Sequence, residues 1–169
     1  MPHSLVTQLR FARTELLRAL DGIPGADAQK RLMPMNSIGW IVGHLAQQEQ
    51  QNWLTRLQGK TLYPNLTEQF GFGKPATTPP LAEVLAAWQE ITEASNSFLD
   101  QLTTADFTTS MFEDRELPGS NVGTFVLRVT YHYWFHIGEI LSIRQILGHP
   151  NLPDYVGDIY HKAPYQPDR

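Results

Sequence analysis

The chain has 169 residues, of which 41% are hydrophobic and 18% charged, a composition that predicts one globular domain with a full hydrophobic core. The net charge of −4 and the scattered lysines and arginines argue against nucleic acid or a membrane surface as partners. Cysteine is absent, which excludes disulfides, thiolate metal sites and a nucleophilic thiol of the protein itself. No apolar run reaches the length of a membrane span and no signal peptide precedes the first helix, so the sequence predicts a soluble cytoplasmic protein.

Four stretches have the apolar spacing of bundle-length helices, and none has the alternation of a useful strand. Asn36 and Thr78 are the expected N-caps of the second and third helices, and Ser120 or Asn121 is the expected N-cap of the fourth. The pattern predicts an all-α four-helix bundle over residues 1–148, followed by an extended tail, 149–169, that packs on the domain or on a partner subunit. The expected helices are Ser4 to Leu20, Ser37 to Gln58, Pro79 to Thr103 and Asn121 to Leu147.

The connection from Thr61 to Pro80 is unusually long for a compact domain. Loops longer than about 15 residues are usually functional, or they cross from one end of a fold to the other. Tyr63, Phe70 and Phe72 give this loop apolar surface, which favours a lid packed on the domain.

Two histidines lie on the core face of the fourth predicted helix. His132 and His136 fall on the same stripe as Val129 and Ile140, at positions that a bundle helix normally gives to leucine. Imidazoles at i and i+4 point the same way and lie about 6 Å apart along the helix axis, which is close enough to bind one cation. A buried histidine without a partner costs free energy, so these two require one.

His44 is the candidate for a third metal ligand, because it flanks the apolar arc of the second helix. Three neutral imidazoles suit Zn, Ni, Fe or Mn at a site with open positions for water or substrate. The alternative is that each histidine bonds a carbonyl or a carboxylate in the core. Spacing alone does not show that His44 reaches the other two.

Glu139, which follows His136 by one helical turn, is the candidate catalytic residue. Its spacing allows a fourth metal ligand, a group that orients an imidazole, or a proton acceptor. The alternative is a buried carboxylate paired with Arg144 or Arg128. The zinc-protease motif is excluded, because it needs a glutamate directly after the first histidine, where Tyr133 stands.

These residues resemble the DinB-like (YfiT-like) family of four-helix bundle metalloproteins. The resemblance covers about residues 4–148 and leaves the tail uncovered. The matching pieces are Ile38-Gly-Trp40-Ile-Val-Gly-His44-Leu-Ala and His132-Tyr-Trp-Phe-His136-Ile-Gly138-Glu139, followed by Leu141 and Arg144.

The resemblance implies an up-down-down-up order of the four helices, a homodimer, and a metal held by His44, His132 and His136. Family members with known activity use a low-molecular-weight thiol such as bacillithiol, mycothiol or glutathione in transfer, isomerisation or detoxification chemistry. The expected function is therefore metal-dependent thiol transfer to a small-molecule substrate. The alternatives are a metal-dependent hydrolase with Glu139 as proton acceptor, and a non-catalytic, stress-related metal-binding dimer.

Overall fold

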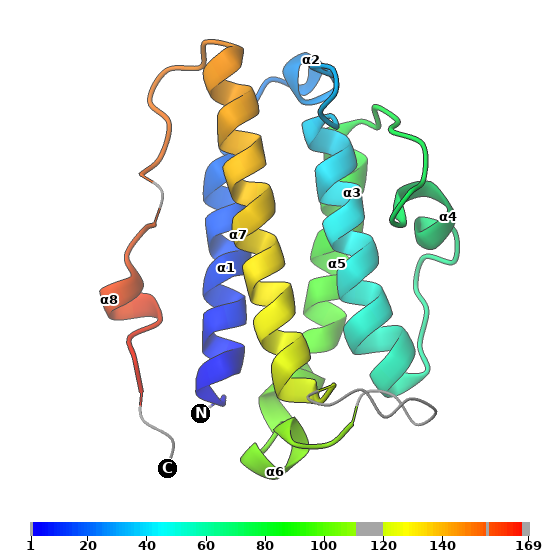
Figure 1. The fold of residues 1–169 in the computed structure, drawn as a ribbon, viewed down its shortest axis with the longest axis vertical. Helices are drawn as coiled ribbons and strands as arrows, with labels where there is room; N and C mark the ends of the chain where they lie inside the picture. Colours follow the sequence, from blue (N-terminus) through cyan, green and yellow to red (C-terminus); the bar gives the residue numbers. More distant parts are fainter. Residues whose placement is uncertain (1, 111–119, 155, 167–169) are drawn as a thin grey trace.

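The computed structural model describes residues 2–110, 120–154 and 156–166, and in these ranges the protein is built of helices (Figure 1). The predicted all-α class is confirmed. The long elements are α1 (Ser4–Leu20), α3 (Ile38–Glu49) with its π-helical continuation η1 (Gln50–Arg56), α5 (Leu81–Gln101) and α7 (Val122–Ile146). Short helical segments lie between and after them: α2 (Gly25–Ala28), α4 (Leu66–Phe70), α6 (Thr104–Phe107) and α8 (Ile159–Lys162).

The four long helices follow the up-down-down-up order. In Figure 1, α1 rises from the N-terminus, α3 descends, and the connection through α4 returns to the top, so that α5 also descends before α7 rises. Helix α1 packs along α7 and α3 packs along α5, while α3 also contacts α7. The long connection is therefore a crossover between two parallel neighbours, and α3 and α7 face each other as antiparallel helices.

The helix starts differ from the predicted caps at two places. Ser37, and not Asn36, caps α3, because its hydroxyl oxygen accepts a backbone N–H of the first turn at 3.2 Å. Helix α5 begins after Pro80 with no side-chain cap, so the capping role predicted for Thr78 is wrong. The residue before a proline is held out of the helical region, so the helix does not begin ahead of Pro80. Asn121 caps α7 as predicted, at 2.8 Å.

Branched apolar side chains from all four long helices form the core. Each such side chain contributes about 1.5–3 kcal/mol when it is fully buried. Side chains at most 1% exposed include Leu9, Leu16, Ile41, Leu45, Ile91, Leu99, Ile140 and Ile143. Within the described ranges, no helix combines the length and the apolar character that a membrane crossing requires.

A buried polar cluster crosses this core and is called here the core polar cluster: Arg13 of α1, Glu49 of α3, Trp88 of α5 and Tyr133 of α7. Arg13 donates to both carboxylate oxygens of Glu49, at 2.9 and 2.6 Å. Tyr133 donates its hydroxyl to Glu49 Oε1 at 2.6 Å and accepts the indole N–H of Trp88 at 2.7 Å. Burial, and then the charge of Glu49, raise the pKa of Tyr133 well above its ordinary value, so the hydroxyl keeps its proton.

The C-terminal tail descends along the outer side of α1 and includes the short helix α8 (Figure 1). Gln8 of α1 donates its side-chain amide to the carbonyl of Ala163 at 2.8 Å. The backbone N–H of Gly157 donates to the carboxylate of Glu15 at 2.8 Å. The tail is thus fastened to α1 by polar contacts, on the side of the bundle away from the α3–α7 interface.

Candidate metal centre

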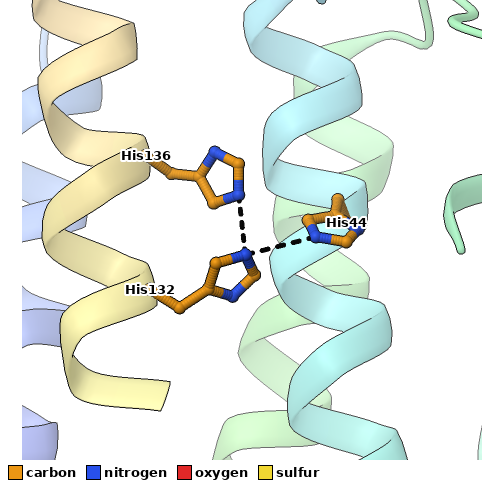
Figure 2. A group of neighbouring side chains, drawn as sticks. All are labelled: His44, His132 and His136. Carbon is orange, nitrogen blue, oxygen red and sulfur yellow. Dashed lines mark hydrogen bonds between the residues drawn. The ribbon is translucent and has the colours of Figure 1, made fainter. Parts of the chain in front are cut away.

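Three histidines from two helices meet between α3 and α7. Figure 2 shows His44 extending from α3 toward His132 and His136, which extend from α7. Nε2 of His132 lies 2.9 Å from Nε2 of His136 and 3.3 Å from Nε2 of His44. One ligand atom from each histidine lies within 4.8 Å of the other two. The structure therefore places His44 of α3 beside His132 and His136 of α7, a contact that the spacing in the sequence did not establish.

The three imidazoles differ in exposure. His44 and His136 are each 6% exposed, while His132 is half-buried. His132 follows Val129 on α7, and His136 precedes Ile140, so the buried apolar residues of the same stripe place both rings against α3. His132 is thus the most exposed of the three.

His44 is oriented by the loop that follows α3. Its Nδ1–H donates to the backbone carbonyl of Phe70 at 2.7 Å, and because a carbonyl only accepts, Nε2 carries the lone pair. The ring of Trp40 stacks on the imidazole, with centroids 5.1 Å apart and planes 9° apart. Gly43 allows Phe70 to lie this close to α3, since a Cβ at Gly43 would lie 2.9 Å from the Phe70 ring. Helix α4 thereby fixes the tautomer that points Nε2 at α7.

The loop between Thr61 and Pro80 packs on the domain only in part. Phe70 is 5% exposed and lies against α3, whereas Phe72 is 97% exposed, so the prediction that Phe72 packs down is wrong. Gly71 precedes Phe72 and Gly73 follows it, and Gly73 has a positive φ of 77°. Tyr63 is half-buried and donates its hydroxyl to Glu90.

Glu139 lies beside His136 on the ring edge opposite the cluster. Its Oε2 accepts from Nδ1 of His136 at 2.5 Å, which leaves the lone pair of His136 on Nε2. Arg144, one of the partners considered for Glu139, donates to the carbonyl of Ala19 at 2.6 Å. The carboxylate therefore contacts the back of an imidazole and not the space among the three Nε2 atoms.

Burial favours the neutral form of the His44 and His132 imidazoles. Burial, with the neighbouring His136 and His44, lowers the pKa of His132 to about 3. Burial likewise lowers the pKa of His44. Two of the three Nε2 atoms carry lone pairs that point at the third ring, an arrangement that a cation stabilises. Two nitrogens bound to one tetrahedral zinc lie roughly 3.3 Å apart, so the observed spacing fits a divalent metal.

A comparison with protein families agrees with this geometry. The family model described as DinB superfamily matches residues 8–140, which is more than half of the chain and includes all three histidines and Glu139. The chain belongs to the DinB superfamily. A search of curated proteins gave no match. Membership of the DinB superfamily and the three-histidine cluster together fit a metal-binding protein.

Sequence reasoning missed four groups around the site of this DinB superfamily protein. They are the carbonyl of Phe70, the stacked ring of Trp40, and the buried pair Glu49 and Tyr133. A carbonyl in a loop has no signature in sequence, although Gly43, directly before His44, marks a close approach to that helix face. Tyr133 reads as an ordinary packing residue until its hydroxyl partner is known.

Proposed function

We propose that this protein is a divalent-metal-dependent enzyme that joins an external low-molecular-weight thiol to an electrophilic small molecule. The observation that carries the proposal is the convergence of three Nε2 atoms at a site where His132 is partly exposed. His44, His132 and His136 would hold Zn, Ni, Fe or Mn. The thiol chemistry follows from what family members do.

The site's residues suit this chemistry. A divalent cation held by His44, His132 and His136 would supply a Lewis acid that lowers the pKa of an external thiol from about 8.5 toward neutrality. Neutral imidazoles add no negative charge, so the attraction for a thiolate is not weakened by the ligands. The chain contains no cysteine, and therefore offers no thiol of its own that competes for the site.

The role proposed for Glu139 is to hold His136. Its carboxylate contacts Nδ1 of His136, so it fixes the ring and strengthens Nε2 as a donor. Hydrolysis with Glu139 as proton acceptor would need the carboxylate beside water at the Nε2 atoms. Loss of hydrolytic activity in Glu139→Gln with metal retained would support that alternative against thiol transfer.

The proposal includes a homodimer, as in related family members. Helix α7 carries Leu127, Tyr131 and Phe135 at four-residue spacing, with exposed fractions of 37%, 65% and 63%. Apolar side chains that line up on one helix face favour contact with another surface. Light scattering coupled to size-exclusion chromatography tests this: a monomer mass at micromolar concentration would contradict it.

The test of the metal centre is elemental analysis of wild type purified without chelator, beside three histidine-to-alanine variants. We expect metal in the wild type and its loss in His44→Ala, His132→Ala and His136→Ala. His161→Ala is the matched control, since that side chain is 85% exposed and far along the tail. Metal retained in His44→Ala would contradict a site that joins α3 to α7.

The test of the thiol is a titration of the cobalt-substituted protein. We expect a sulfur-to-cobalt band when a low-molecular-weight thiol is added, and no such band in the His132→Ala variant. An unchanged visible spectrum would contradict thiol transfer. If fully metallated protein converts no thiol-plus-electrophile pair and no ester, the result would favour the alternative of a non-catalytic metal-binding dimer over an enzyme.

A further inference from the structure

The core polar cluster adjoins the metal centre in sequence and in space. His132 and Tyr133 are consecutive on α7, so their side chains point about 100° apart, His132 toward His44 and Tyr133 into the core. Glu49, which accepts the Tyr133 hydroxyl, follows His44 by five residues, or about 7.5 Å along α3. One hydrogen bond thus joins the two helices that carry the three histidines.

Glu49 is itself held from two other helices. Its side chain is fully buried, and the guanidinium of Arg13 of α1 donates hydrogen bonds to both of its carboxylate oxygens. The same guanidinium donates to Ser95 Oγ and to Asn96 Oδ1 of α5, each at 3.2 Å. The acceptor of the Tyr133 hydroxyl therefore has a position set by α1, α3 and α5 together.

A small rotation of α7 would separate the histidines. Side-chain tips lie about 5–6 Å from a helix axis, so a rotation of 10° moves them by about 1 Å. Metal–ligand distances tolerate errors of about 0.2 Å. A Tyr133 hydroxyl kept within hydrogen-bonding distance of Glu49, and backed by the Trp88 indole, restricts that rotation.

We propose that Tyr133 is a positioning residue of the metal centre, whose hydrogen bond to Glu49 sets the rotation of α7 so that His132 and His136 meet His44. The functional role of this alignment of the three histidines rests on the proposed metal binding. The alignment itself is a property of the metal-free fold, and it is measurable without metal.

The test is Tyr133→Phe, which removes one oxygen and keeps the ring. Tyr160→Phe is the matched control: it makes the same change on α8, where the side chain is 84% exposed. We expect Tyr133→Phe to bind Co(II) about 10-fold more weakly, with an altered visible d–d spectrum, because outer positioning groups typically contribute 10–100-fold. Tyr160→Phe should match wild type. Wild-type affinity and spectrum in Tyr133→Phe, with only its urea midpoint lowered, would overturn the proposal.

Glu49→Gln separates positioning from stability. It keeps an oxygen that accepts the Tyr133 hydroxyl but removes the charge that pairs with Arg13. We expect its urea midpoint to fall while its Co(II) affinity stays within about 3-fold of wild type. A loss of Co(II) affinity that simply tracks the loss of stability across both variants would overturn the proposal.

Failure of the proposed function is distinguishable from failure of this inference. If the wild type binds no Co(II), the metal function fails, and the alignment is read from long-range ¹H–¹⁵N spectra of the imidazoles in metal-free protein. The Nε2 signals of His132 and His136 should move in Tyr133→Phe and stay in place in Tyr160→Phe. Coincident spectra for Tyr133→Phe and wild type would overturn it.

Discussion

Glu139 accepts a hydrogen bond from Nδ1 of His136 at 2.5 Å, one helical turn away on α7. His44 has the same arrangement with a different partner, the carbonyl of Phe70. Both rings are therefore held by the nitrogen that faces away from the cluster. Two of the three donors are preorganised by groups that would not themselves touch the metal.

Removal of the Glu139 carboxylate should weaken metal binding without unfolding the protein. Loss of an acceptor behind a metal-bound imidazole typically costs 10–100-fold in affinity, so Glu139→Ala should raise the Kd for zinc by about that factor. The Glu139 side chain is 32% exposed, so circular dichroism should remain that of wild type. Competition with a chromophoric chelator gives the Kd, and Glu83→Ala on α5 is the control. An unchanged Kd would remove Glu139 from the site.

Gly43 and Gly138 make a matched pair of helical glycines near the histidines. A Cβ on Gly43 would lie 2.9 Å from three atoms of the buried Phe70 ring, whereas a Cβ on Gly138 would have no neighbour within 4 Å. Gly43→Ala should lower the free energy of unfolding by about 1–3 kcal/mol and weaken metal binding, because Phe70 is displaced from His44. Urea unfolding and metal titration measure the two effects.

Gly138→Ala should act in the opposite direction. Alanine restricts the unfolded chain and favours a helix, so this variant should gain about 0.5–1 kcal/mol and keep wild-type metal affinity. Equal stability changes in the two alanine variants would show that the Phe70 contact does not constrain Gly43.

The ion pair of Arg13 and Glu49 should be costly to break from one side. Both side chains are buried, with exposed fractions of 6% and 0%, and Arg13→Met leaves the Glu49 carboxylate without its cation. The expected loss is about 3–5 kcal/mol in the free energy of unfolding. The double variant Arg13→Met, Glu49→Leu should recover at least about half of that loss, because it leaves no unpaired buried charge. Strictly additive losses in chemical denaturation would contradict this.

Metal should stabilise the fold, since its ligands come from both α3 and α7. At a free metal concentration of 100 times Kd, ligation contributes about 2.7 kcal/mol, which for a domain of this size raises Tm by about 5–11 °C. A chelator should return Tm to its starting value. Scanning calorimetry of wild type and His44→Ala, each with and without zinc, makes the comparison; a rise of the same size in His44→Ala would place the ion elsewhere.

Much of this arrangement is predictable from the sequence. The apolar spacing predicts four helices, and α1 begins at Ser4 and ends at Leu20 as expected. His132 and His136 were identifiable because they interrupt an apolar stripe. Two adjacent capping residues, Asn36 and Ser37, made the start of α3 ambiguous; Ser37 also donates to the carbonyl of Thr77, a contact that only the fold reveals.

Other parts of the site depend on distant contacts that leave no local pattern. The second predicted helix is continuous to Gln58, but beyond Glu49 it widens into the π-helical η1, and this changes which residues face the core. Glu49 lies in a run of polar residues, so the sequence does not mark it as buried. Its burial is compensated by the ion pair with Arg13, which lies 36 residues away. Such pairs become visible only when the four helices are assembled.

His44 and His132 are separated by 88 positions in the chain, with the crossover loop and all of α5 between them. A chain still being synthesised, with α1 and α3 already helical, possesses one of the three imidazoles and no second donor from α7. An ion that needs all three donors thus discriminates finished molecules from partial ones. Metal binding would then follow folding, and the metal content of a preparation would measure the fraction of molecules in which α3 and α7 are packed together.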